Sequence, residues 1–169
     1  MEILYFMKKT DIIRDKMLEY YASDPMRIQH FIKVESFASI IAEREKVDEE
    51  TATVISILGY VHDIGIKIAE EKYGRSTGKL QEELGEIPAK DMVLSCGFAK
   101  EIADRVSYVT SHHHTYTMID NMEYQILVEA DFLVNIFEDE MDRAKAISIR
   151  DKIFKTKSGT DLINQMYGI

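Results

Sequence analysis

Two short motifs place histidine and aspartate within apolar sequence. His62 and Asp63 are adjacent near the end of the string ILGYVHDIG, and Asp131 lies within VEADFLV. An ionised carboxylate in apolar surroundings loses its hydration, at a cost in free energy, unless a partner compensates its charge. A divalent cation would bind the imidazole and the carboxylates together. The two motifs therefore indicate a candidate metal site.

The other histidines fit the same hypothesis. The sequence contains 5 histidines, and besides His62 they are His30 and the run 112–114. With His30 and Asp131 the set has two imidazoles and two carboxylates, which suits Mn, Mg, Fe, Ni or Zn and leaves positions open for water or substrate. Two structural alternatives stay open. The His-Asp pair could face solvent at a helix end, and Asp131 could pair with a buried arginine or cap a neighbouring helix.

The composition favours helices to hold these residues. A chain of 169 residues can bury a sizeable core within one domain, and with only 8 Gly and 2 Pro it contains few helix breakers. We therefore predict an all-α fold, a single compact bundle of about six to eight helices. The net charge of -9 argues against a partner such as duplex nucleic acid, which needs a basic surface. A metal could still bring a phosphorylated ligand into an acidic protein.

The location of the protein is predicted from what the sequence lacks. Cys96 is the one cysteine, so an internal disulfide framework is excluded and a reducing compartment is favoured. The start MEILYFMKK does not resemble a secretion signal, and no window approaches the apolar length of a membrane span. We expect a cytoplasmic protein without a membrane partner, and a homodimer is left open.

Apolar periodicity predicts the helices that position the motifs. They cover residues 2–21, a second helix capped by Asp24 with Pro25 at its first position and running to Glu45, a third helix capped by Asp48 and ended by Gly65, then 89–96 closed by Gly97, a helix from Ala99, residues 123–138, and helical structure from 139 onward. The stretch 73–88 contains three glycines and alternating charge, so we expect an irregular connection there.

Helical spacing also predicts which histidines face inward. His62 continues the apolar stripe of its helix and should point into the protein. His112 and His113 lie three and four residues beyond Val109, whereas His114 falls off that stripe. A polar helix terminus, with one histidine capping carbonyl groups, is the structural alternative for this run.

The order H…HD…D resembles the HD-domain superfamily of metal-dependent phosphohydrolases. The resemblance rests on RIQH, GYVHDIG, HHHTY and QILVEADFLVN, and it extends from about residue 27 to 138. It implies a single HD domain over 1–169, with a core of about 24–140 on which N- and C-terminal helices pack. It also implies that His30, His62, Asp63 and Asp131 bind the metal, with Co added to the candidate ions.

The resemblance leaves open a second metal. Some branches of the superfamily use additional histidines between the HD pair and the last aspartate, and His112 and His113 lie in that interval. A further intermediate histidine of those branches has no counterpart between Asp63 and His112. Gln81, Glu82 and Glu83 lie in that region instead.

The expected activity is hydrolysis of a nucleotide or another small phosphate ester by a metal-activated water. Asp63 would hold the metal and orient the water, and His112 or His113 would protonate the leaving group. Arg27, one helical turn before His30, and Lys67, shortly after the HD pair, are candidate phosphate contacts, although a solvated surface charge is the more common role of such residues.

Two alternative functions follow from the same resemblance. A minority of HD proteins are di-iron oxygenases, but they need a six-ligand set that this sequence does not clearly supply. A non-catalytic HD domain that senses a metal or ligand would keep the site without turnover.

Overall fold

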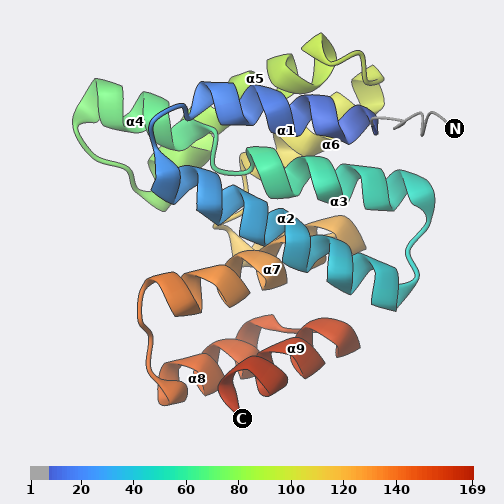
Figure 1. The fold of residues 1–169 in the computed structure, drawn as a ribbon, viewed down its shortest axis with the longest axis vertical. Coiled ribbons are helices and arrows are strands. Elements are labelled where there is room, and N and C mark those ends of the chain that lie inside the picture. The colour runs from blue at the N-terminus through green and yellow to red at the C-terminus, as the bar shows by residue number, and fades with distance from the viewer. Residues whose placement is uncertain (1–7) are drawn as a thin grey trace, which may run out of the picture.

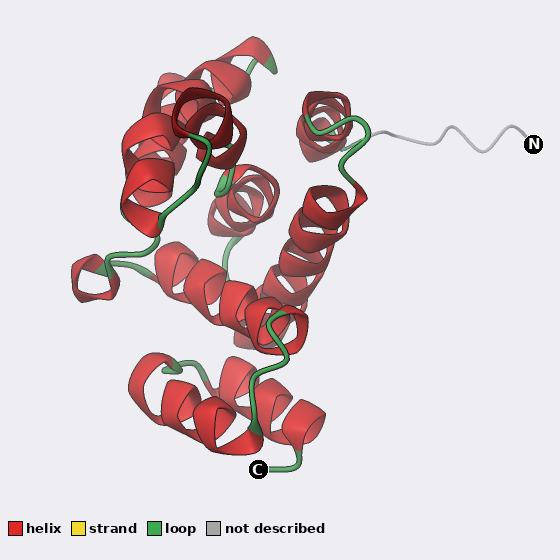
Figure 2. Cartoon of the chain, turned by 90° about the vertical axis from the view of Figure 1, so that its left-hand side faces the viewer, coloured by secondary structure: helices red, strands yellow, loops and turns green. Residues whose placement is uncertain are grey.

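α3 lies at the centre of the first group of helices. The computed structural model describes residues 8–169, and in that range it consists of helices and loops without a strand (Figures 1 and 2). The α-helices are α1 (Lys9–Tyr20), α2 (Pro25–Glu45), α3 (Glu49–Val61), α4 (Gly65–Tyr73), α5 (Gly78–Ser95), α6 (Lys100–Thr110), α7 (Met122–Glu138), α8 (Arg143–Ile153) and α9 (Lys157–Tyr167), with a short 3-10 helix at Tyr116–Met118. α3 contacts α1, α2, α6 and α7. The predicted all-α class is confirmed.

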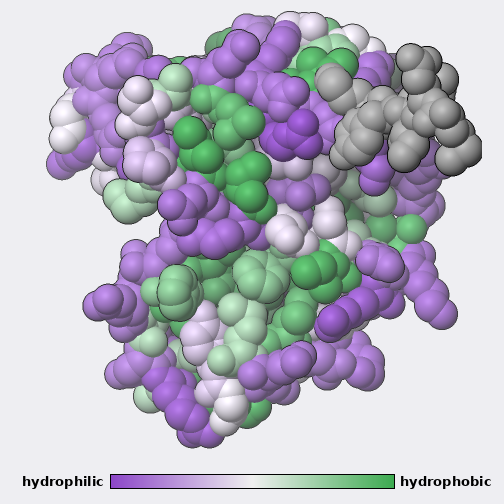
Figure 3. All heavy atoms as spheres, viewed as in Figure 1, coloured by the Kyte–Doolittle hydropathy of each residue, from purple (hydrophilic) through white to green (hydrophobic). Residues whose placement is uncertain are grey.

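α7 lies between two layers of helices. It contacts α2 and α3 on one side and the α8–α9 pair on the other, and α9 also contacts α2 (Figure 1). α4, α5 and α6 pack in sequence order beside this centre. On the face drawn in Figure 3, polar side chains cover most of the surface, and apolar side chains gather where α1 meets α2 and over α7.

Several predicted helix ends are confirmed. The Asp24 carboxylate accepts a hydrogen bond from the Arg27 N–H at 3.1 Å, with Pro25 at the first position of α2. The Asp48 carboxylate accepts one from the Thr51 N–H at 2.9 Å and so caps α3. Both contacts satisfy backbone donors that a helix start leaves free. The predicted start of the first helix at Glu2 lies outside the described residues, within which α1 begins at Lys9.

Two predictions between the HD pair and Pro88 are wrong. The expected irregular connection is mostly helix, because α5 begins at Gly78 and continues through Pro88. Gly65, expected to end the third helix, is the first residue of α4, and α3 already ends at Val61. A Cβ atom at Gly65 would lie 2.4 Å from the Gln81 carbonyl oxygen and 2.8 Å from the Gly85 nitrogen, so glycine is needed for the close approach of α4 and α5. Tertiary packing here outweighs low helix propensity.

The expectation that no window resembles a membrane span also needs correction. The segment 49–73, which comprises α3 and α4, is long and apolar enough to cross a membrane by length and composition. Within the protein, 67% of the apolar window is buried. The apolarity of this segment is therefore accounted for by the core position of α3.

A buried carboxylate joins the C-terminal helices to α7. Glu129 is 0% exposed, and its Oε1 accepts hydrogen bonds from the N–H groups of Lys155 and Thr156 at 2.6 and 2.9 Å and from Gln125 Nε2 at 2.8 Å. Thr156, which also caps α9, donates its hydroxyl to the other oxygen. Burial raises the pKa of Glu129, although these donors act to lower it. The start of α9 is thereby attached to the centre of the fold.

We expect Glu129→Ala to lower the free energy of unfolding by about 3 kcal/mol, because it leaves buried donors without an acceptor. Glu45→Ala is the control, since the half-buried Glu45 carboxylate also accepts a hydrogen bond at the start of α9, from the Ser158 N–H. Urea unfolding followed by circular dichroism measures both. An equal loss in the two variants would contradict the role of Glu129.

Candidate metal centre

Three helical segments bring together the four residues of the H…HD…D order. His30 comes from α2, His62 and Asp63 from the turn between α3 and α4, and Asp131 from α7. His30 Nε2 lies 3.2 Å from Asp131 Oδ1 and 3.4 Å from Asp63 Oδ2. His62 Nε2 lies 3.6 Å from each of these two oxygens. Each carboxylate is therefore in contact with both imidazoles.

His113 joins this group from the turn after α6. Its Nε2 lies 3.4 Å from Asp63 Oδ1, the oxygen that faces away from His30. The residue is 2% exposed, and its ring centroid is 5.4 Å from that of His62. We call the set His30, His62, Asp63, His113 and Asp131 the cluster.

The turn that carries the HD pair is held from behind. The hydroxyl of Tyr21 donates to the Asp63 carbonyl at 2.8 Å, and that of Tyr20 donates to the Ile64 carbonyl at 3.1 Å. Lys67 Nζ in turn donates to the Tyr20 carbonyl at 2.9 Å and lies over the Tyr20 ring. These contacts join the end of α1 to the turn, where the Asp63 carbonyl also accepts a hydrogen bond from the Ile66 N–H at 3.0 Å. They also place the ammonium of Lys67 behind the turn, so the structure does not bring this predicted phosphate contact to the cluster.

The imidazoles of the cluster present the same nitrogen to its centre. His62 Nδ1 lies 3.2 Å from the carbonyl oxygens of both Leu58 and Gly59, and His113 Nδ1 lies 2.7 Å from the Thr110 carbonyl oxygen. A carbonyl can only accept, so Nδ1 carries the proton in each ring. The lone pair of a neutral ring is then on Nε2, which is the nitrogen that faces the carboxylates.

The charges of the cluster shift the pKa values of its members. Burial would lower the pKa of His30, but Asp131 and Asp63 raise it to about 9. Burial would also lower the pKa of His113, but Asp63, the Thr110 carbonyl and Asp131 together raise it. Burial would raise the pKa of Asp63 and of Asp131, whereas the surrounding imidazoles hold both values below the usual range. The carboxylates are therefore ionised near neutral pH.

The residues present fit a divalent cation. Within residues 8–169, His113 Nε2 and Asp131 Oδ1 are buried atoms without a hydrogen-bond partner, which is uncommon in a folded protein. One ligand atom from each of His30, His62 and Asp63 lies within 4.8 Å of the others, and the same holds for Asp63, His113 and His114. Imidazole nitrogens and carboxylate oxygens are ligands for Mn, Fe, Co, Ni and Zn ions.

The histidine run does not follow the predicted helical stripe. α6 ends at Thr110, and residues 111–114 form a turn, so spacing by helical period no longer applies. His112 Nδ1 lies 2.7 Å from the Tyr108 carbonyl oxygen, and the two rings stack with centroids 4.4 Å apart, away from the cluster. His114, expected off the stripe, has its ring centroid 4.0 Å from that of His113.

His114 is held by the start of α5. Its Nε2 lies 2.6 Å from Gln81 Oε1, and its N–H donates to Glu82 Oε1 at 3.0 Å. Burial, with His113 as a second cause, lowers the pKa of His114 to about 4, so the ring is neutral. The part of α5 that was expected to be irregular therefore positions a neighbour of the cluster.

Arg27 does not contact the carboxylates of the cluster. Its guanidinium pairs with Glu70 on α4 at 2.9 Å. Arg27 Nε is buried without a hydrogen-bond partner among the described residues. Arg27 thus joins the start of α2 to α4, one helical turn before His30.

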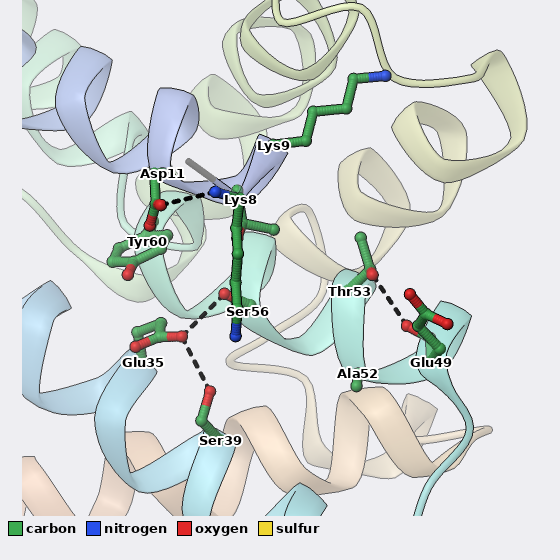
Figure 4. A pocket seen from close by; sticks show the side chains of 11 residues that line it. Lys8, Lys9, Asp11, Glu35, Ser39, Glu49, Ala52, Thr53, Ser56 and Tyr60 are labelled. Carbon is green, nitrogen blue, oxygen red and sulfur yellow. Dashed lines mark hydrogen bonds between the residues drawn. The ribbon is translucent and has the colours of Figure 1, made fainter. Parts of the chain in front are cut away.

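A separate groove of about 550 Å³ lies between α1, α2 and α3 (Figure 4). Its polar groups largely satisfy one another, since the hydroxyls of Ser39 and Ser56 donate to Glu35 at 2.9 and 2.8 Å, and the Lys8 N–H donates to Asp11. The residues that line it include none of the cluster. The groove therefore adds nothing to the chemistry of the candidate metal centre.

Residues 27–156 of this chain match the HD domain family. The chain belongs to the HD domain family. No match was found among curated proteins. HD domains bind divalent metals, and the histidine and aspartate groups of the cluster could hold such an ion.

Two solved structures have a similar fold. A predicted HD superfamily hydrolase from an uncultured Thermotogales bacterium is 24% identical with a TM-score of 0.63, and the match covers 95% of this chain and 83% of that one. Bacillus subtilis YpgQ, solved in complex with ADP, is 19% identical with a TM-score of 0.66, and the match covers 95% of this chain and 88% of that one. The chain thus has the fold of HD-superfamily hydrolases.

The raised pKa of His30 predicts that binding of a cation to this HD domain depends on pH. The folded pKa of about 9 exceeds the ordinary histidine pKa of 6.5, so His30 is protonated at neutral pH and the proton favours the metal-free fold. That contribution to stability is complete below pH 6.5 and is lost as the pH rises through about 9. A cation must displace the proton, so Mn²⁺ affinity should rise by up to about tenfold per pH unit from neutral pH to about pH 9.

Isothermal titration calorimetry in buffers of different ionisation enthalpy measures both the affinity and the released proton. Affinity that does not change with pH, with no proton released at neutral pH, would contradict the charge state derived for His30.

Proposed function

We propose that this protein is a metal-dependent phosphohydrolase that acts on a nucleotide or another small phosphate ester. The observation that carries the proposal is the pair of buried carboxylates, Asp63 and Asp131, each in contact with His30 and His62. Supporting it, Asp131 Oδ1 is a buried atom with no hydrogen-bond partner in residues 8–169. The ADP in the complex of the similar protein YpgQ supports a nucleotide-like ligand.

In this proposal His30, His62, Asp63 and Asp131 hold the divalent cation. When bound, the cation lowers the pKa of a coordinated water and polarises a phosphoryl oxygen. Asp63 can use both oxygens, because Oδ2 faces His30 and His62 while Oδ1 faces His113. The imidazole side chains keep the two carboxylates ionised and fixed in place.

His113 is the proton donor in this proposal. Its Nε2 is the buried nitrogen that lies 3.4 Å from Asp63 Oδ1, and the carboxylate raises the pKa of His113, which favours the protonated ring. A general acid needs this combination of a protonated group and a position beside the reacting atoms. His112, the other donor considered from the sequence, is turned away toward Tyr108.

The activity test uses the purified protein with Mn²⁺ and a panel of nucleotides and phosphate esters. We expect phosphate or pyrophosphate release that requires the metal, and a loss of at least about 100-fold in kcat/KM in Asp131→Asn, because the neutral amide is a weaker metal ligand. Lys67→Met is the control, because it removes a charge that contacts the Tyr20 carbonyl and ring and leaves the residues of the cluster unchanged. Two bound irons with oxygen consumption, or no hydrolysis of any phosphate ester, would contradict the proposal.

The histidine run provides a second test. We expect His113→Gln to lower kcat by about 100-fold or more while Mn²⁺ still binds, because a proton donor is lost. His112→Gln should retain activity, since that ring lies outside the cluster. Calorimetry also measures how many Mn²⁺ ions bind per chain. Two cations per chain, with the second lost in His113→Gln and His114→Gln, would instead assign these residues to a second metal site with Asp63.

A further inference from the structure

Glu138, the last residue of α7, lies behind the first histidine of the cluster. Its Oε2 is 2.8 Å from His30 Nδ1, and its Oε1 is 2.6 Å from Lys33 Nζ. The side chain is 23% exposed, whereas that of His30 is 9% exposed. A charged chain of contacts therefore runs from Lys33 through Glu138 to the imidazole.

This partner distinguishes His30 from the other imidazoles of the cluster. His62 and His113 have backbone carbonyls beside Nδ1, and these are held by the helix ends that contain them. His30 has a side-chain carboxylate at the same place. The orientation of His30 therefore depends on a side chain that can be replaced, and a carboxylate is also a stronger acceptor than a neutral carbonyl.

α7 contacts both nitrogens of the His30 ring. Asp131 Oδ1 lies 3.2 Å from Nε2, and Glu138, about two helical turns further along α7, lies at Nδ1. Residues two turns apart share one face of a helix. α7 thus supplies both Asp131, which contacts Nε2 of His30, and Glu138, which holds the opposite nitrogen of the same ring.

We propose that Glu138 is a positioning residue that accepts the Nδ1 proton of His30, so that Nε2 points to the bound cation with increased donor strength. Lys33 holds the second oxygen of Glu138 and keeps the carboxylate in this place. The inference rests on the proposed function, because it requires that a divalent cation binds at the cluster. Carboxylates behind metal-binding histidines act in this way in general.

The experiment measures the Mn²⁺ affinity of the wild-type protein and of Glu138→Ala and Glu138→Gln by calorimetry. We expect Glu138→Ala to weaken binding by about 10- to 100-fold. Glu138→Gln keeps an acceptor for Nδ1–H and should recover part of that loss. Thermal unfolding of the metal-free variants reports structure alone, and it should not follow the order of the affinities.

Glu123→Gln is the matched control. Glu123 lies in the first turn of the same helix, eight residues before Asp131, is 13% exposed and pairs with Arg105 at 2.6 Å. Its replacement should leave Mn²⁺ affinity unchanged within about twofold, because outer partners act only through the ligand they contact. Equal affinity in wild type and in both Glu138 variants would overturn this inference alone. A wild-type protein that binds no divalent cation would overturn the proposed function and this inference together.

Discussion

The structure depends on the compensation of two carboxylates that are removed from water. Asp63 and Asp131 lie among the imidazoles of His30, His62 and His113 at distances of 3.2 to 3.6 Å. Burying an ion is costly unless opposite charge and hydrogen bonds accompany it. α2, the α3–α4 turn and α7 must therefore meet at one place, and that requirement accounts for the position of α7 across the middle of the bundle.

The surroundings of the cluster reduce the freedom of its members. Backbone carbonyls fix two of the imidazoles, the hydroxyls of Tyr20 and Tyr21 fix the turn, and Glu138 fixes His30. Ligands that are held in place before binding lose less conformational entropy when a cation arrives. α3 packs its buried apolar residues against the neighbouring helices and so keeps the turn that carries the HD pair in a fixed framework.

Regular helices made much of this predictable from the sequence. The stripe that ends at His62, the caps Asp24 and Asp48, and the apolar surroundings of Asp131 all follow from helical period and capping chemistry. Periodicity failed where a helix ended or where packing overrode propensity. His112 and His114 exchanged their expected places because α6 stops at Thr110.

The other errors have the same origin. The first part of α5, residues 78–88, was missed because the packing of Gly78 against His114 and of Gly85 against Thr110 and Gly65 is tertiary, and the sequence does not reveal it. Glu138 was missed although its position two turns after Asp131 was a readable signal of a shared face. Glu129 carried no such signal, since its partners at Lys155 and Thr156 come from a distant turn.

The most direct test of the central claim is a crystal structure of the protein with Mn²⁺, recorded at the manganese absorption edge. The account predicts an anomalous peak bounded by His30 Nε2, His62 Nε2, Asp63 and Asp131, at the bond lengths of a coordinated ion. A saturated crystal without a peak at this place, or with its manganese bound only at other residues, would contradict it.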